Sequence, residues 1–305
     1  MHKKKILIPG GTGFLGYHLC LNLKKRGWII HSISKSKPKQ KRYISGVKYI
    51  LCDVADKTKL NKKLDYYYDY IVNFSGYVDH SRNKSIAKSH FNGCKNLINI
   101  FKTRDIKKFI QIGSSIEYGT KKSPQKESKF EKKINTQSVY GNAKLSSTLF
   151  LKDLYNKEKI PVTILRLYLV YGPNQDVNRV IPFVINNCIK NKRFKCSPGY
   201  QLRDFLYIDD LIDIIFKILE NEKSNGEIIN IGSGIPISLK KLIKKICRLS
   251  KGGNPEFGKI AFRKDELLKL YPNLSKLKKI TNWQQRINLK EGLEKTISYY
   301  KKLGK

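Results

Sequence analysis

The chain has 305 residues, of which 40% are hydrophobic and 28% charged, so it can bury a sizeable core in one large domain or in a domain with a smaller lobe. It has no apolar run of the roughly 18 residues that a membrane span needs, and its basic start lacks the long apolar region of a signal peptide, so we expect a cytoplasmic protein without a membrane partner. The formal net charge of +38 comes from lysines spread along the whole chain, which favours attraction of an anionic small molecule over nucleic acid as the main partner.

Short apolar runs alternate with helical stretches through the first half of the chain. We expect strands at residues 5–10, 28–34, 47–54, 68–76, 107–115 and 162–173, and helices at residues 13–27, 57–64, 90–106 and 138–158. Such alternation implies right-handed crossovers and a parallel sheet with helices on both faces. The predicted fold class is therefore α/β, a Rossmann-type doubly wound parallel sheet with a smaller C-terminal lobe.

The pattern loosens after Pro173. We expect helices at residues 179–191, 238–250 and 288–304, a strand running into a helix at 203–221, and a strand at 226–234, whereas residues 252–284 look irregular. The cysteines predict no metal site, because they form no C-x-x-C pair and no histidine cluster accompanies them. We expect buried free thiols at Cys20, Cys52, Cys94, Cys188, Cys196 and Cys247.

A glycine-rich turn follows the first predicted strand. Gly10, Gly13 and Gly16 have the spacing G-x-x-G-x-x-G and stand between that strand and a helix that includes Phe14 and Leu15. The first glycine permits a positive φ, the second lets a pyrophosphate approach the main chain, and the third lets the helix pack closely on the strand. The free N–H groups of the helix N-terminus then face the phosphates. The alternative is a purely structural turn.

The ends of the second and third strands bear on the choice of cofactor. An NAD site usually has an acidic residue at the end of the second strand, but this chain has Lys35 there, between two serines. Positive charge without a carboxylate favours a 2′-phosphate and therefore NADP, although NAD stays open and Lys35 could belong to a basic surface loop. At the end of the third strand, Asp53 and Val54 suit an adenine contact, and the alternative for Asp53 is a helix cap.

A tyrosine, a lysine and two serines form a candidate catalytic set. Tyr140 and Lys144 are four residues apart on one predicted helix face. A phenol has an ordinary pKa of about 10, and we expect the ammonium of Lys144 to lower it toward acid–base work. Ser114 and Ser115 stand at the C-terminal end of the fifth strand, where an open parallel sheet builds its site.

These motifs together resemble the extended short-chain dehydrogenases/reductases, in the NAD(P)-dependent nucleotide-sugar epimerase/dehydratase branch. The segments GGTGFLG, CDV, VNFSG, GSSIEYG, YGNAK, LRLYLVYGP, RDFLYIDD and NIGSG occur in the order and spacing of that family over nearly the whole chain. The resemblance implies Ser114, Tyr140 and Lys144 as the catalytic set, with Tyr140 and Lys144 also contacting the cofactor. It further implies Asn92, Ser115 and Arg203 as substrate contacts, although a salt bridge from Arg203 to Asp204 or Asp209 is the alternative.

The resemblance also implies a domain plan and partners. Residues 1–172 would form the dinucleotide-binding Rossmann domain, with 202–235 returning to it, and residues 173–201 and 236–305 would form the substrate-binding lobe. The expected partners are a nucleotide-diphosphate sugar and a second copy in a homodimer, with no metal. The chain departs from the family pattern with Pro9 in place of threonine, Leu169 in place of an asparagine that contacts the substrate phosphate, and Ser115-Ile116 where the 4,6-dehydratases carry Asp-Glu.

Without those two carboxylates a dehydratase is disfavoured, and two reactions remain. The first, which residues 197–205 and Lys35 favour, is a 4-ketoreductase that transfers hydride from NADPH to a nucleotide-linked 4-keto-6-deoxy sugar with Tyr140 as general acid. The second is a 4-epimerase with tightly bound NAD. A catalytically silent NADP-binding regulator stays open as another class, and a nucleic-acid binder would reveal itself by a steep salt dependence.

Overall fold

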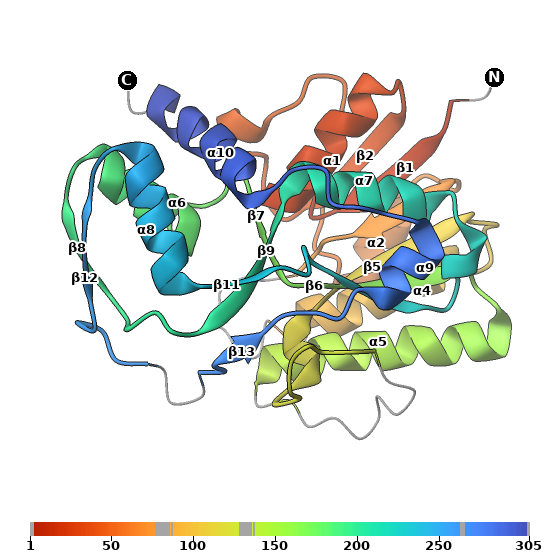
Figure 1. The fold of residues 1–305 in the computed structure, drawn as a ribbon. Helices are drawn as coiled ribbons and strands as arrows, with labels where there is room; N and C mark the ends of the chain where they lie inside the picture. Colours follow the sequence, from red (N-terminus) through yellow and green to blue (C-terminus); the bar gives the residue numbers. More distant parts are fainter. Residues whose placement is uncertain are drawn as a thin grey trace.

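A seven-stranded sheet forms the centre of the molecule (Figure 1). In the computed structural model, the described residues are 3–76, 86, 88–127, 136, 138–262 and 266–303. The sheet has the order β10-β6-β5-β4-β1-β2-β3, and every neighbouring pair is parallel. Its strands are β1 (Lys5–Pro9), β2 (Ile29–Ser34), β3 (Lys48–Leu51), β4 (Tyr70–Asn73), β5 (Lys108–Ser114), β6 (Val162–Leu167) and β10 (Ile228–Ile231). This order confirms the predicted Rossmann-type α/β fold.

Helices cover both faces of this sheet (Figure 1). One face carries α1 (Phe14–Lys25) and α7 (Ile208–Leu219), and the other carries α2 (Lys57–Lys63), α4 (Gly93–Phe101) and α5 (Val139–Glu158). Successive residues of a strand point to opposite faces, so a strand covered on both sides reads as a continuous apolar run. In β1, Ile6 and Ile8 pack in the cluster that includes Leu19 of α1, whereas Leu7 packs with Leu97 of α4.

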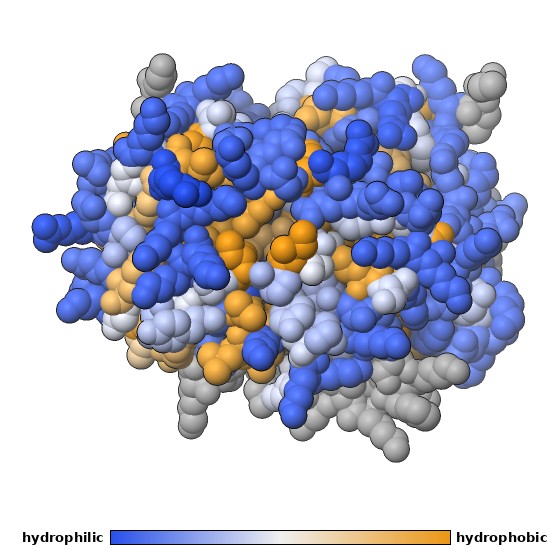
Figure 2. Space-filling view, viewed as in Figure 1, coloured by the Kyte–Doolittle hydropathy of each residue, from blue (hydrophilic) through white to orange (hydrophobic). Residues whose placement is uncertain are grey.

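The C-terminal lobe combines small sheets with three long helices. Its larger sheet joins β7 (Leu169–Tyr171), β9 (Leu202–Tyr207), β11 (Pro236–Ser238) and β13 (Lys269–Leu270), and its smaller sheet pairs β8 (Arg193–Cys196) with β12 (Asn254–Phe257). The helices α6 (Val180–Ile189), α8 (Leu239–Ser250) and α10 (Leu289–Leu303) pack against one another, and the short α9 (Ser275–Thr281) packs on α7 and β10. Figure 2 shows a largely hydrophilic face, which agrees with the high lysine content. Apolar surface is gathered in the middle of this face.

Three details differ from the sequence expectations. The predicted strand 162–173 is two strands, because the chain leaves the main sheet after Leu167 and β7 joins β9 in the lobe. The strand expected at the start of 203–221 is β9, which pairs with β7 and is not part of the seven-stranded sheet. The stretch 252–284, expected to be irregular, holds β12, β13 and α9. Among the described residues, no helix has the length and apolar character to cross a membrane.

Candidate active site

The glycine turn between β1 and α1 is closely packed at Gly10 and Gly16. Gly10 has φ +81°, and a Cβ on it would lie 2.8 Å from the carbonyl carbon of Phe74, which follows β4. A Cβ on Gly16 would lie 2.4 Å from the carbonyl oxygen of Gly10. The absence of side chains therefore lets the turn pass close to the end of β4 and lets α1 pack against the turn.

The first turn of α1 forms a cradle that suits a pyrophosphate. Gly13 is the N-cap residue, and no side chain caps the helix, so its first N–H groups, at Phe14, Leu15 and Gly16, are available to an anion. A Cβ on Gly13 would lie 3.2 Å from the oxygen of Gly10 and would narrow this cradle. The residues present therefore fit the diphosphate of a dinucleotide cofactor. Sequence reasoning missed Arg42, a buried side chain that donates to the carbonyls of Thr12 in this turn and Asn174 in the lobe.

The two residues predicted at the adenosine end of the cofactor lie in contact. The ammonium of Lys35, just after β2, is 2.6 Å from a carboxylate oxygen of Asp53, just after β3. Asp53 also accepts from the N–H of Ala55, while the cap of α2 is Asp56, whose side chain accepts from Lys59. Val54 is buried and packs against Gly93, the first residue of α4. The contact is so close that a Cβ on Gly93 would lie 2.5 Å from the Val54 side chain. Asp53 is therefore not the cap of α2, which was the alternative to an adenine contact.

The structure brings Ser114, Tyr140 and Lys144 together. Ser114 ends β5, and Tyr140 stands in the first turn of α5, whose N-cap Ser138 accepts from the N–H of Gly141. Lys144 lies one turn later and is buried. Its ammonium donates to the carbonyl of Ile112 in β5 at 2.6 Å and lies 5.9 Å from the centre of the Tyr140 ring.

The acid–base balance of this set differs from the sequence expectation. Loss of water around the phenol raises the pKa of Tyr140 to about 12, while a hydrogen bond with Ser114 and the charge of Arg179 act in the lowering direction. Burial likewise lowers the pKa of Lys144 to about 8. Lys144 is not the group that lowers the phenol pKa in this structure. At neutral pH the phenol is therefore protonated and able to donate a proton.

A buried carboxylate organises the segment that follows Ser114. Glu117 accepts from the N–H of Ser114 at 2.7 Å, from the hydroxyl of Thr148 in α5 at 2.7 Å, and from Nε of Arg166 in β6 at 2.9 Å. Glu117 and Arg166 are both 0% exposed, and the guanidinium also lies over the Tyr118 ring at 4.4 Å. This network ties the end of β5 to α5 and β6, and so fixes the backbone that carries Ser114.

Sequence reasoning also missed a histidine beside Tyr140. His90 is buried, and its ring meets the Tyr140 ring edge-on with 5.0 Å between the two centres. Its carbonyl accepts from Ser147 on α5. Asn92, the residue expected here, lies two positions later and is exposed at the start of α4. The turn that holds both residues, η2 (Lys88–Asn92), is π-helical, and such a turn is frequent at functional sites but is not visible in a sequence pattern.

The residues predicted to contact the substrate are divided between the two lobes. Ser115 is buried after β5. Arg203, in β9, is buried and pairs with Glu266 and with the carbonyl of Leu202, rather than with Asp204 or Asp209. Asp204 instead accepts from the N–H groups of Ser233 and Gly234. In the part of the chain that the structure describes, no group of three or more histidine, cysteine or acidic side chains could hold a metal.

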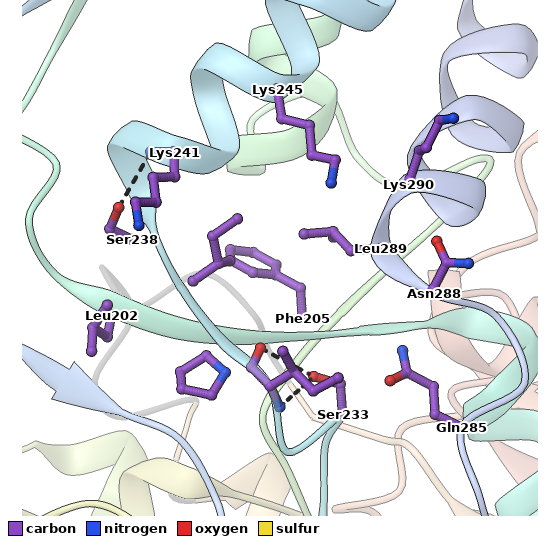
Figure 3. Close-up of a pocket in the computed structure, with 13 residues that line it drawn as sticks. Leu202, Phe205, Ser233, Ser238, Lys241, Lys245, Gln285, Asn288, Leu289 and Lys290 are labelled. Atoms are coloured by element: carbon purple, nitrogen blue, oxygen red, sulfur yellow. Dashed lines mark hydrogen bonds between the residues drawn. The ribbon is translucent and has the colours of Figure 1, made fainter.

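The lobe also contains a basic pocket of about 560 Å³ (Figure 3). Lys241 and Lys245 reach toward it from α8, and Lys290 borders it from α10. Its floor includes the apolar side chains of Phe205 and Leu289. The pocket borders β9, the strand that carries Arg203, but Arg203 is not part of its wall. The predicted substrate arginine and this basic pocket are therefore separate features of the same lobe.

A Rossmann sheet with a phosphate cradle on its first helix, and a serine, tyrosine and lysine at the end of β5, defines a nucleotide-cofactor enzyme of the oxidoreductase type. The NAD dependent epimerase/dehydratase family matches residues 6–232, and the chain belongs to this family. It is thus an NAD(P)-dependent enzyme of the epimerase, dehydratase and reductase group that acts on nucleotide sugars.

Individual relatives carry different activities. The chain is 28% identical to human dTDP-D-glucose 4,6-dehydratase, covering 98% of this chain and 90% of the relative. It is also 28% identical to the CDP-abequose synthase of Salmonella muenchen, covering 97% of both chains. Among solved structures, UDP-glucuronic acid 4-epimerase from Bacillus cereus in complex with UDP-glucuronic acid and NAD matches with a TM-score of 0.84 at 25% identity, over 98% of this chain and 99% of that one.

Proposed function

We propose that the chain is a 4-ketoreductase that acts on a nucleotide-linked 4-keto-6-deoxy sugar. NADPH, when bound, supplies the hydride that is added to the keto carbon. Tyr140 then donates its phenolic proton to the carbonyl oxygen, Ser114 hydrogen-bonds that oxygen, and Lys144 contacts the cofactor ribose. The observation that carries this proposal is the hydrogen bond between the phenol of Tyr140 and Ser114 at the end of β5, because a reduction needs a proton donor beside the keto oxygen.

A dehydratase is disfavoured because it would need an acid and a base next to Ser114. The two positions after Ser114 are Ser115 and Ile116, and neither can remove a proton from carbon. The nearest carboxylate along the chain, Glu117, is 0% exposed and is held by Arg166 and Thr148. It is therefore not available to a substrate. This argument separates the chain from its dehydratase relatives.

The direct test is turnover with defined substrates. The purified chain is mixed with a panel of nucleotide-linked 4-keto-6-deoxy sugars that differ in the base, with NADPH or NADH, and the absorbance of the reduced nicotinamide is followed. We expect stoichiometric oxidation of NADPH with at least one substrate. If no keto sugar is reduced and a nucleotide sugar is instead interconverted with its C4 epimer without net change of the cofactor, the reductase proposal is wrong.

The choice of NADPH over NADH rests on Lys35. Its ammonium stands at the end of β2, and a 2′-phosphate there would gain a charge-assisted contact worth about 1.5–3 kcal/mol. The ion pair between Lys35 and Asp53 offsets part of this gain. We expect NADPH to bind at least tenfold more tightly than NADH at physiological salt, and Lys35→Asp to remove the difference. Equal affinities in the unchanged chain would assign Lys35 to a basic loop.

The 4-epimerase with bound NAD is the second candidate. The observation that favours it is the Lys35–Asp53 pair, which leaves less positive charge for a 2′-phosphate. Against the epimerase stands Lys35 at the end of β2, where an NAD site usually has an acidic residue. A silent NADP-binding regulator would bind the cofactor without turnover in any of these assays. We expect a cytoplasmic location and a homodimer.

A further inference from the structure

Two cysteine thiols from different helices of the C-terminal lobe are in contact. Cys188 stands in the last turn of α6 and Cys247 in α8, 59 positions later, and their sulfur atoms are 3.5 Å apart. Both cysteines are free. Because the sulfurs of a disulfide are about 2.0 Å apart, a bond would need an approach of only about 1.5 Å.

The two thiols differ in accessibility and in acidity. Cys188 is 2% exposed. Gly253, in the turn after α8, packs against it so closely that a Cβ on this glycine would lie 2.7 Å from the Cys188 sulfur. Cys247 is partly exposed. The thiol of Cys188 donates to the sulfur of Cys247, which lowers the pKa of Cys247 and raises that of Cys188. Cys247 is therefore the thiol that solvent reaches and the one that ionises first.

We propose that Cys247 and Cys188 form an oxidation site that reacts with a small-molecule disulfide of the glutathione disulfide class and closes into a disulfide between α8 and α6. This inference goes beyond the proposed reaction and does not depend on it. Lys244 lies three positions before Cys247 on the same side of α8, and Lys251, four positions after Cys247, is the C-cap residue just beyond the helix. Their positive charges favour the approach of an anionic disulfide.

The chemistry balances in two thiol–disulfide exchanges. The Cys247 thiolate attacks one sulfur of glutathione disulfide, the sulfur–sulfur bond breaks, and one glutathione leaves as a thiolate. Cys188 then loses its proton, its sulfur attacks the Cys247 sulfur of the mixed disulfide, and the second glutathione leaves as a thiolate. Overall, two cysteine thiols are oxidised and one glutathione disulfide is reduced to two molecules of glutathione.

The other cysteines are poor competitors and supply a matched control. Burial raises the pKa of Cys20 and of Cys94 to about 12, so both remain neutral thiols at physiological pH. Cys196 belongs to the same part of the lobe, but it is buried, and burial raises its pKa to about 11. A Cys196→Ser variant thus removes a neighbouring sulfur without removing either partner of the contact.

The experiment treats the full chain, fully reduced, with glutathione disulfide. The number of free thiols should fall from the six of the sequence to four, with a Cys188–Cys247 peptide in the non-reducing digest. Because the crosslink closes a long loop, the thermal midpoint should rise by about 4–8 °C. Cys196→Ser should react as the unchanged chain does. In Cys188→Ser the reaction should end after the first exchange, with one glutathione bound to Cys247. Cys247→Ser should not react with glutathione disulfide.

Three results would overturn the proposal. One is retention of all six thiols while a small dithiol, in a separate tube with the same glutathione disulfide, is oxidised. Another is a stable glutathione adduct on Cys247 in the unchanged chain, which would show that Cys188 cannot complete the second exchange. The third is oxidation in Cys247→Ser at the rate of the unchanged chain, which would place the reactive thiol elsewhere.

Discussion

Replacing Glu117 by glutamine tests the buried network that holds Ser114. The carboxylate accepts from Ser114, Thr148 and Arg166, and the amide of glutamine keeps only one acceptor oxygen. If that oxygen stays with the N–H of Ser114, the new NH₂ group faces the donors of Thr148 and Arg166. The guanidinium, 0% exposed, then loses the carboxylate at its Nε. Removing one partner of a buried ion pair typically costs 3–5 kcal/mol, so we expect Glu117→Gln to lower the free energy of unfolding by about that amount.

The assay is urea unfolding, with a surface pair as the control. Glu227 pairs with Lys276 at 2.8 Å, and both side chains are about one third exposed, so Glu227→Gln should change the free energy of unfolding by about 1 kcal/mol or less. Adding Arg166→Met to Glu117→Gln removes the second member of the buried ion pair and should recover part of the loss. A loss below about 1 kcal/mol in Glu117→Gln, or no recovery in the double variant, would refute the assignment of a stabilising buried ion pair.

Two further predictions concern Lys144 and Gly16. The pKa of Lys144 is about 8 in the folded chain, whereas its ordinary value is 10.5. Between pH 8 and pH 10.5 the amine of Lys144 is therefore protonated in the unfolded chain and neutral in the folded chain. Raising the pH through this range should increase the free energy of unfolding by up to about 3 kcal/mol. The free energy of unfolding of the unchanged chain and of Lys144→Met is measured at pH 7.5 and at pH 10.5, and the unchanged chain should gain more stability between the two pH values. The same change in both chains would contradict this prediction. Gly16→Ala places a Cβ 2.4 Å from the oxygen of Gly10, so we expect at least tenfold weaker cofactor binding by calorimetry, whereas unchanged affinity would show that the turn can shift without loss.

Local spacing made part of the site predictable. The glycines at 10, 13 and 16 signal a turn without side chains, and Tyr140 and Lys144, four apart on a helix, must share one face. The alternation of strands and helices predicted the fold, and the segments from GGTGFLG to NIGSG indicated the family.

What the sequence did not reveal depends on tertiary contacts. Arg166 stands 49 positions after Glu117, and the ring of His90 meets Tyr140 only after α5 packs near η2. The expected effect of Lys144 on the phenol was wrong because burial, which dominates the pKa of both groups, is not visible in a sequence spacing. Two lobe strands, β11 and β13, were not predicted because they have only three and two residues, too few to show an alternating pattern.

Turnover by the Tyr140→Phe variant tests the central claim most directly. The variant keeps the ring beside His90 and removes only the hydroxyl that donates the proton. With the keto sugar that the unchanged chain reduces, we expect kcat to fall by roughly 10²-fold or more, the usual weight of general acid catalysis, while the dissociation constant for NADPH stays within about twofold. Near-normal turnover in this variant would contradict the assignment of Tyr140 as the general acid, and with it the proposed reaction at this site.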